Sequence, residues 1–183
     1  MNSPISIVIR SMDRPALKRA LDSVSAQRLK PREIVVVAAC GSRHGPLPAV
    51  DPAITARLVF PDAGLERLNR PQAGNTGLRA TTQDWIGFLD DDDEYLPEHL
   101  ETLFPAAQQF FQAGGLRGRL AYSLAQGIDR AGNATDLYGR SFSFVHIWDN
   151  TLVHTMNALF HRSLLAEGVV FDESLDILED WDF

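Results

Sequence analysis

The chain has 183 residues, with 17 Lys and Arg side chains against 24 Asp and Glu, so its formal net charge is −7. It contains 45% hydrophobic and 22% charged residues, which is the composition of one folded domain and excludes a disordered chain. A net-acidic chain lacks the clustered basic residues that a broad nucleic-acid interface needs, so no nucleic-acid partner is expected. The single cysteine, Cys40, excludes an internal disulfide framework and a multi-cysteine zinc site.

The sequence contains no apolar segment that fits a membrane span or a signal-peptide core. The first apolar run is broken by Arg10, and no later run reaches the ~18 apolar residues that a spanning helix needs. We therefore expect a cytoplasmic domain without a transmembrane segment. The oligomeric state stays open.

Charge is divided unevenly along the chain. Residues 1–89 contain twelve basic and seven acidic side chains, a net +5, whereas residues 90–183 contain five basic and seventeen acidic ones, a net −12. This asymmetry predicts anion contacts in the first half and cation contacts in the second, although solvated faces can differ in charge by chance.

The first elements form a strand–helix–strand unit. Residues 5–9 are short, β-branched and apolar, which predicts a strand buried on both faces. Asp13 and Pro15 predict a helix start with Asp13 as the N-cap, and the apolar spacing continues to Val24. A second buried strand is expected at residues 33–37, parallel to the first.

The later elements extend this pattern to an α/β fold with a mostly parallel central sheet flanked by helices. After a Gly- and Pro-rich loop at 40–52, we expect strands at 57–60, 85–89 and 157–160, and short helices at 74–82 and 161–167. A longer helix is expected after Pro97, with Phe110 and Phe111 on its apolar face, a kink at Pro105 and an end at residues 114–115. Residues 119–145 predict a meander or hairpin. These assignments all rest on the printed sequence.

Five consecutive acids at residues 90–94 follow directly on the strand expected at 85–89. An acidic run is often only a solvated loop, since burying unpaired carboxylates costs several kcal/mol. This run, however, occupies the carboxyl end of a buried strand, where open α/β sheets bind ligands. Aspartates two residues apart there predict a Mg²⁺ or Mn²⁺ site that in turn binds a diphosphate.

Other nucleotide and hydrolytic chemistries lack their motifs. The segment after the first strand is not G-x-G-x-x-G, and the chain contains neither a P-loop nor a G-x-S-x-G nucleophile elbow. The five histidines show no metal-ligand spacing and are interpreted as structural or surface residues, with His154 singled out because it precedes the strand expected at 157–160. Cys40 is interpreted as a small residue at the end of the second strand.

Four sets of residues follow one another in a familiar order and cover nearly the whole chain. They are ISIVIRSMDRP at 5–15, LDSVSAQ at 21–27, NTGL at 75–78 with WIGFLDDDDEYLP at 85–97, and FDESL at 171–175 with LEDW at 178–181. They resemble, in turn, V-S-V-I-I-P-T-Y-N-R, L-x-S-v-l-x-Q, N-x-G-l with D-x-D, and F-D-E-x-L with E-D-W. The chain thus resembles the GT-A-fold inverting glycosyltransferases of family 2, in the nucleotide-diphospho-sugar transferase superfamily.

The resemblance implies a metal-dependent enzyme that moves a sugar from a nucleotide-diphosphate sugar to a carbohydrate or other hydroxyl acceptor with inversion. It divides a single GT-A-like domain, residues 1–183, into a nucleotide-sugar-binding half at 1–113 and an incomplete acceptor-side half at 114–183. The implied metal ligands are Asp92 and Asp90, with Mn²⁺ or Mg²⁺. The general base is Asp180, with Glu179 as its alternative or its orienting partner. The implied nucleotide-sugar contacts are Arg10, Ser11, Asp13, Arg14, Arg70, Asn75, Asp90 and Asp91.

Three features depart from the family pattern. Arg10 stands where the family has a proline, and contacts a phosphate or is a surface variant. Ala38 and Ala39 replace the acidic pair of which one member contacts the base, so the nucleotide is left open. The chain ends just after the E-D-W motif, so a catalytic domain shortened at its C-terminus is expected.

Two other functions remain open from the sequence. The first is a non-catalytic module that only binds a nucleotide sugar. It is suggested by Ala38 and Ala39 in place of the acidic pair and by the end of the chain directly after the E-D-W motif. A phosphotransferase with an aspartate nucleophile also places D-x-D after a buried strand. That chemistry usually has Thr or Val where this chain has Glu94.

Overall fold

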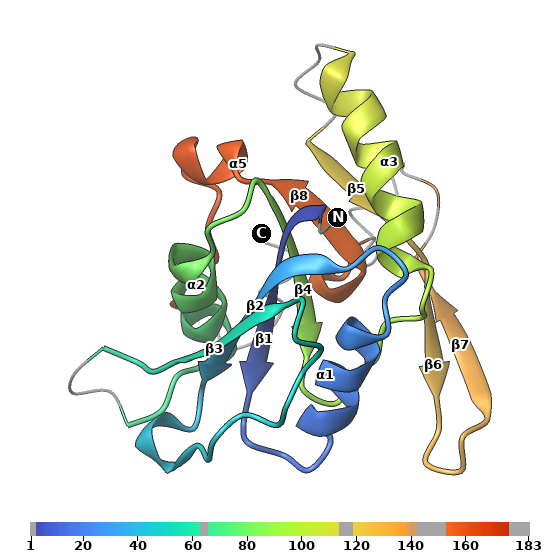
Figure 1. Cartoon of the computed structure of the whole chain (residues 1–183). Coiled ribbons are helices and arrows are strands. Elements are labelled where there is room, and N and C mark those ends of the chain that lie inside the picture. Colours follow the sequence, from blue (N-terminus) through green and yellow to red (C-terminus); the bar gives the residue numbers. More distant parts are fainter. Residues whose placement is uncertain (1–2, 63–65, 114–118, 140, 142–152, 176–183) are drawn as a thin grey trace.

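A six-stranded sheet runs through the centre of the computed structural model, in the order β3-β2-β1-β4-β8-β5 (Figure 1). The structure describes residues 3–62, 66–113, 119–139, 141 and 153–175. Strands β1, β2, β3 and β4 are parallel, and β8 is antiparallel to both β4 and β5. Their bounds are β1 Ser3–Ser11, β2 Pro31–Ala38, β3 Thr55–Val59, β4 Trp85–Asp90, β5 Leu120–Tyr122 and β8 Ala158–His161.

The mostly parallel sheet expected from the sequence is confirmed, and its physical basis is burial on both faces. Side chains of β1 and β4 alternate between two apolar clusters, with Ile7, Ile9 and Leu89 in one and Val8 and Phe88 in the other. A strand covered on both faces must be apolar at every position, which is why these segments read as continuous hydrophobic runs.

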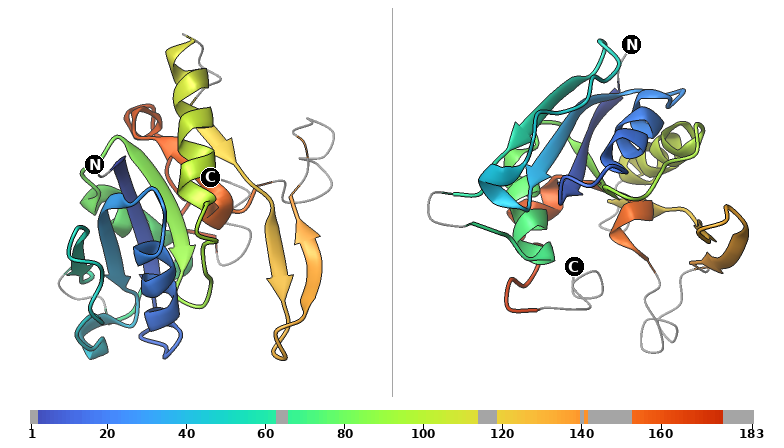
Figure 2. Two further views of the ribbon diagram at one scale, coloured as in Figure 1. Left: turned by 45° about the vertical axis from the view of Figure 1, so that its right-hand side comes forward. Right: turned by 90° about the horizontal axis from the view of Figure 1, so that it is seen from below.

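Helices cover the sheet on both sides (Figure 2). Helices α1 (Leu17–Ser25) and α3 (His99–Gln112) pack on the face that includes Ile7 and Ile9. Helix α2 (Arg70–Ala80) and the short α5 (Ser163–Ala166) lie on the face that includes Val8 and Phe88. Single turns of 3₁₀ helix occur at Gly41–Arg43 and Thr155–Asn157. None of the described helices is long and apolar enough to cross a membrane.

A two-stranded hairpin, β6 (Ala125–Ile128) with β7 (Ala134–Tyr138), stands apart from the central sheet in Figures 1 and 2. It confirms the hairpin expected between residues 119 and 145.

Two details differ from the sequence-based expectations. Asp13 does not cap a helix: α1 begins at Leu17 after Ala16 and has no side-chain cap, while Asp13 adopts a positive φ of 60° in the preceding loop. Of the two phenylalanines expected on the apolar face of α3, Phe110 is 62% exposed, whereas the Phe111 ring packs edge-on against Trp85. Pro105 lies inside a continuous α3, whose last residue is Gln112, and the expected end at 114–115 lies outside the described residues.

Helix α2 approaches the sheet closely through Gly77. A Cβ added at Gly77 would lie 2.2 Å from Cγ1 of Val8 and 3.2 Å from Cγ2 of Val37. Only a residue without a side chain allows this distance, which explains the glycine of the NTGL segment.

We predict that Gly77→Ala destabilises the protein although alanine favours helices. Helix propensity alone would stabilise the variant by about 1 kcal/mol. The contact with Val8 should outweigh that gain, because overpacking a filled core costs roughly 1–3 kcal/mol. Thermal unfolding measures the difference, with Arg79→Ala on the exposed side of α2 as the control. An unchanged or raised melting temperature for Gly77→Ala would contradict the close packing.

Candidate functional site

The site begins with the register between two parallel strands. Arg10 on β1 lies directly beside Asp90 on β4; Arg10 is the last but one residue of β1, and Asp90 is the last residue of β4. Side chains alternate along a strand, so Arg10 and Asp90 point to the face covered by α2. Ser11 and Asp91, the next residues, point to the face covered by α1. The acidic run is therefore split between the two faces of the sheet.

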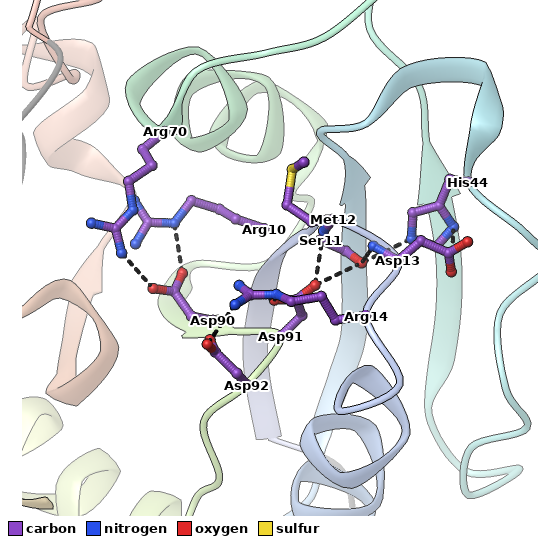
Figure 3. Close-up of polar contacts among 10 residues, drawn as sticks. All are labelled: Arg10, Ser11, Met12, Asp13, Arg14, His44, Arg70, Asp90, Asp91 and Asp92. Carbon is purple, nitrogen blue, oxygen red and sulfur yellow. Dashed lines mark hydrogen bonds and ion pairs between the residues drawn. The ribbon is translucent and has the colours of Figure 1, made fainter.

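Asp90 is held by two arginines (Figure 3). Nε of Arg10 donates to its Oδ1 at 2.9 Å, and Nη2 of Arg70 donates to its Oδ2 at 3.1 Å. The Arg10 and Asp90 side chains are only 5% and 10% exposed, whereas that of Arg70 is 61% exposed. Arg10 also lies over the Phe88 ring, 5.9 Å from its centroid. One buried and one exposed cation thus meet the charge of Asp90.

Asp91 is fully buried and organises the loop after β1. Its Oδ2 accepts from the Met12 backbone N–H at 2.8 Å and from the Ser11 hydroxyl at 3.3 Å, and its Oδ1 accepts from Nε of Arg14 at 2.8 Å. Burial lowers the pKa of Arg14, but the hydrogen bond to Asp91 and the neighbouring aspartate charges raise it, and the net direction is upward. Asp91 therefore contacts loop residues rather than open space.

The next acids lie nearer to solvent. Asp92 accepts a hydrogen bond from Nη1 of Arg14 at 2.6 Å through Oδ2, and its side chain is 48% exposed. Burial, followed by the charges of Asp90 and Asp92, raises the pKa of Asp93 from an ordinary 3.8 to about 6. Asp93 therefore resists ionisation more than an exposed aspartate does.

Two polar contacts, one buried and one exposed, tie the loop after β1 to the loop after β2. The Ser11 hydroxyl lies 2.8 Å from Nε2 of His44, and the Asp13 carboxylate accepts from the Gly45 N–H at 3.0 Å. Ser11 and the His44 side chain are 0% exposed, so this Ser–His pair is structural and not a hydrolytic nucleophile. The interpretation of His44 as structural is consistent with this burial. Ser11 and Asp13 hold the shape of the loop.

A pocket of about 520 Å³ opens beside the bridge between Arg10, Asp90 and Arg70. Four of the described residues that line it are arginines, and one is an acid: Arg10, Arg14, Arg67, Arg70 and Asp90. The N-terminus of α2 also borders the pocket, and a helix N-terminus favours negative charge. The pocket is therefore suited to an anion, as the basic first half of the sequence predicted.

Several residues of this pocket are not predicted from the sequence. Arg67, Asn69 and Gln72 line it just before and at the start of α2. The detectable signal was a capping box, in which the Asn69 side chain accepts from the Gln72 N–H and the Gln72 side chain accepts from the Asn69 N–H. That box shows that α2 begins at Arg70, four residues before the predicted start.

The wall next to β2 is apolar. Ala39, Met12 and Leu68 line the pocket there, and the Leu68 N–H donates to the Ala39 carbonyl at 2.9 Å. This is the place for which the resemblance predicted a missing base-contacting carboxylate. Among the described residues of this wall, no acid replaces it.

Asn75, which the resemblance predicts to contact the nucleotide sugar, bonds two residues of the FDESL segment. Its amide accepts from the Phe171 N–H at 3.0 Å and donates to the Phe171 carbonyl at 2.9 Å. It also donates to Oε1 of Glu173 at 2.9 Å. Asn75 therefore fastens the FDESL segment to α2. The expected catalytic residues Glu179 and Asp180, a few positions later, lie outside the described residues.

The carboxylates differ in how well they fit a divalent cation, which prefers oxygen ligands. Asp92 presents a half-exposed carboxylate and fits. Asp90 fits less well, because each of its oxygens bonds an arginine. Within the described ranges, no group of three or more His, Cys, Asp or Glu is arranged to hold a metal ion. The two aspartates expected to share a metal are thus in different environments.

Comparison with known families decides what this fold is. The model of the family described as "Glycosyl transferase family 2" matches residues 6–168, which include the sheet and the arginine-lined pocket. This chain belongs to glycosyl transferase family 2. The resemblance drawn from four motifs is confirmed at the level of the family and of the GT-A fold.

Individual relatives agree with this family 2 membership. An uncharacterized glycosyltransferase, YwdF of Bacillus subtilis (strain 168), is 27% identical over 185 residues, covering 98% of this chain and 66% of the relative. The mannosyltransferase PcManGT from Pyrobaculum calidifontis, solved with GDP-Man and Mn²⁺, has a TM-score of 0.64 at 18% identity, covering 100% of this chain and 50% of that chain. S. aureus TarS 1-349 in complex with UDP-GlcNAc has a TM-score of 0.60 at 14% identity, covering 99% and 51%. The chain thus spans about half to two thirds of their lengths.

The raised pKa of Asp93 predicts a pH-dependent gain for Asp93→Asn. The folded protein keeps this proton up to about pH 6, whereas the unfolded chain loses it near 3.8, so stability falls as the pH rises through this window. The uncharged amide of Asp93→Asn avoids that loss of stability. The melting temperature of this variant should therefore exceed that of the unaltered protein by roughly 2–4 °C at pH 7.5. The advantage should vanish near pH 4.

Thermal unfolding between pH 4 and 8 measures this effect, with Glu94→Gln as a control that removes one charge from the same acidic run. A pH-independent difference between Asp93→Asn and the parent would contradict the assigned environment.

The Asn75 contacts predict a loss of stability for Asn75→Asp. An aspartate cannot donate to the Phe171 carbonyl and would face the Glu173 carboxylate. Leaving buried partners unpaired costs about 1–3 kcal/mol. Denaturant unfolding compares this variant with Gln109→Glu, the same chemical change at an exposed position of α3. Equal stability of the two variants would show that Asn75 does not fasten the FDESL segment.

Proposed function

We propose that this chain binds a nucleotide-diphosphate sugar in the arginine-lined pocket and transfers the sugar to an acceptor hydroxyl with inversion. The observation that carries this proposal is the position of the pocket. Four arginines gather at the carboxyl ends of β1 and β4, beside the acidic run, in a family 2 glycosyltransferase fold. This edge is where open α/β sheets bind their ligands.

The donor's diphosphate lies against the guanidinium groups. Arg70 and Arg14 are each about half exposed or more and border the pocket, so their N–H groups can meet phosphate oxygens. Asp91, Ser11 and Asp13 act indirectly, because their contacts hold the loop that presents Arg14. Asp90 orients Arg10 and Arg70 and borders the ribose and diphosphate.

A divalent cation, Mn²⁺ or Mg²⁺, belongs to this proposal with Asp92 as its ligand. When bound, the metal supplies a Lewis acid that neutralises charge on the departing diphosphate. The half-exposed position of Asp92 and the presence of Mn²⁺ in the PcManGT structure support this assignment. At Asp90 the cation would have to displace an arginine.

The transfer itself is a direct displacement at the anomeric carbon. The acceptor oxygen forms the new bond to that carbon, and the bond to the diphosphate oxygen breaks with its electron pair leaving on the diphosphate. The acceptor proton passes to the carboxylate of Asp180, with Glu179 as its orienting partner or alternative. These roles rest on the resemblance of LEDW to E-D-W. The Asn75 contacts support it, because they fasten the segment that leads to these residues.

The donor is a hexose on a nucleoside diphosphate. PcManGT was solved with GDP-Man and TarS with UDP-GlcNAc, so both bases occur in chains of this fold. The apolar wall of Ala39, Met12 and Leu68 lacks an acid that would select the imide N–H of uracil. The acceptor is a hydroxyl compound.

We predict that Asp92→Ala and Asp180→Asn fail in different ways. Asp92→Ala should remove the increase in donor affinity that Mn²⁺ causes, with the fold retained, because one of five crowded like charges is lost. Asp180→Asn should keep donor and metal affinity, since its amide has nearly the same shape. Transfer should still fall by ~10²–10⁴, the usual effect of losing a general base.

Calorimetry with nucleoside diphosphates and a sugar-transfer assay separate these effects. Asp22→Asn, exposed on α1 and paired with Lys18, is the control. If Asp180→Asn transfers sugar at the parent rate, Asp180 is not the base and Glu179→Gln becomes the next variant. If the parent binds donor but neither transfers nor hydrolyses it, the chain is a binding module.

A further inference from the structure

The pocket has two chemically different sides. Ala39, Met12 and Leu68 form the apolar wall at the end of β2. Elsewhere the lining is charged and includes the ion pair of Arg10 with Asp90. A nucleoside diphosphate is divided in the same way, because its base is a flat ring with apolar faces and its diphosphate is charged. The apolar wall is therefore the part of the pocket against which a base packs best.

Arg67 borders the pocket beside this apolar wall, and the backbone is held on both sides of it. On one side, the Leu68 N–H donates to the Ala39 carbonyl at 2.9 Å. On the other side, Gly41 adopts a positive φ of 69°, and a Cβ added to it would overlap the carbonyl oxygen of Glu66. The segment that includes Arg67 is thus pressed against the turn that follows β2.

The guanidinium of Arg67 is free to bind a ligand. Among the residues that the structure describes, none forms a hydrogen bond or an ion pair with the Arg67 side chain, whereas Arg14 bonds both Asp91 and Asp92. Arg67 is exposed, so its N–H groups are solvated. A ligand in the pocket can therefore accept from Arg67 without breaking a contact within the protein.

A guanidinium fits some bases better than others, because it has N–H donors in a fixed fork and no acceptor. The fork matches a base edge with two adjacent acceptors, such as N7 and O6 of guanine or N3 and O2 of cytosine. Adenine has an amino donor beside N7, and uracil and thymine have an imide N–H between their carbonyls. Each of these three bases offers the fork a single acceptor, and the apolar wall, as described, has no carboxylate to accept from their N–H groups.

Resting on the proposed function, we infer that Arg67 selects the base of the donor and favours guanine or cytosine over adenine, uracil and thymine. The base packs on the apolar wall, and the Arg67 fork donates to its two adjacent acceptors. The diphosphate lies on the charged side of the pocket and makes the same contacts in every nucleotide. Arg67 therefore determines which nucleotide binds, whereas the diphosphate contacts are common to all.

The first test compares five nucleoside diphosphates on the unaltered protein. GDP, CDP, ADP, UDP and dTDP are titrated by calorimetry in the presence of Mn²⁺. The better ligand of GDP and CDP should bind at least about 10-fold more tightly than the other three, the discrimination typical of a bidentate arginine–base pair. If ADP, UDP or dTDP binds as tightly, the inference is overturned and the proposed function stands. Failure of all five to bind would instead contradict the proposed function.

The second test uses two Arg67 variants and inorganic pyrophosphate, which has no base. Arg67→Met should weaken the preferred nucleotide by about 10-fold and so remove the preference. Arg67→Lys keeps the charge without the fork, and should also lose the preference. Pyrophosphate should bind both variants within about twofold of its affinity for the unaltered protein, because salt screens a charge that it does not touch.

Two results with these variants would overturn the inference. Equal weakening of all five nucleotides and of pyrophosphate by Arg67→Met would show that Arg67 contacts the diphosphate. A preference that survives in Arg67→Met or in Arg67→Lys would show that the fork does not select the base. Arg67 is exposed, so both variants should fold as the parent does, and thermal unfolding measures this.

The matched control is Arg28→Met. Arg28 is exposed and pairs with Glu98 at 2.7 Å, away from the pocket lining, and its loss changes the net charge equally. This variant should keep both the preferred nucleotide and its affinity. If Arg28→Met loses the preference as Arg67→Met does, the effect is one of net charge and the inference is overturned.

Discussion

The ion pair between Arg10 and Asp90 is the constraint on which the site depends. Parallel register puts the two residues side by side at the ends of β1 and β4, where each strand leaves the core. An acidic run at this place would repel itself and could not be buried. The buried Arg10 on the adjacent strand neutralises the charge of Asp90 and so allows its burial. Asp90 in turn holds Arg70 at the rim of the pocket through a hydrogen bond.

The alternation of side chains along the strands extends this arrangement to the second aspartate. Asp91 turns to the opposite face, where it bonds the Met12 backbone and Arg14. The loop after β1 is consequently held by carboxylate contacts rather than by a glycine-rich turn. Ser11, His44 and Asp13 link the same loop to the one after β2. Much of the acidic run therefore supports arginines instead of remaining free for cations.

Helix α2 connects the arginine-lined pocket to the segment that precedes the proposed base. Gly77 lets the helix lie close to Val8, which brings its N-terminus and Arg70 to the pocket. Two positions earlier, Asn75 bonds both backbone polar groups of Phe171. One helix thus borders the arginine-lined pocket at its start and contacts the FDESL segment in its middle. A change in how α2 packs on the sheet would therefore shift both the residues at the pocket and the FDESL segment.

The sequence by itself determined the fold class and the family. Apolar β-branched runs specify buried parallel strands wherever they lie, and ordered motifs need no coordinates to be recognised. It also located the acidic run at a strand end. The sequence did not reveal that Asp90 and Asp91 serve opposite faces, or that Arg10 is buried against Asp90. Nor did it show that Asn75 holds Phe171, or that Arg67, Asn69 and Gln72 complete the pocket.

These features depend on pairs such as Arg10 and Asp90, 80 residues apart in sequence. Local propensity and periodicity describe only near neighbours. Strand register and the close approach of α2 to the sheet bring the distant partners together, and only the tertiary structure contains them.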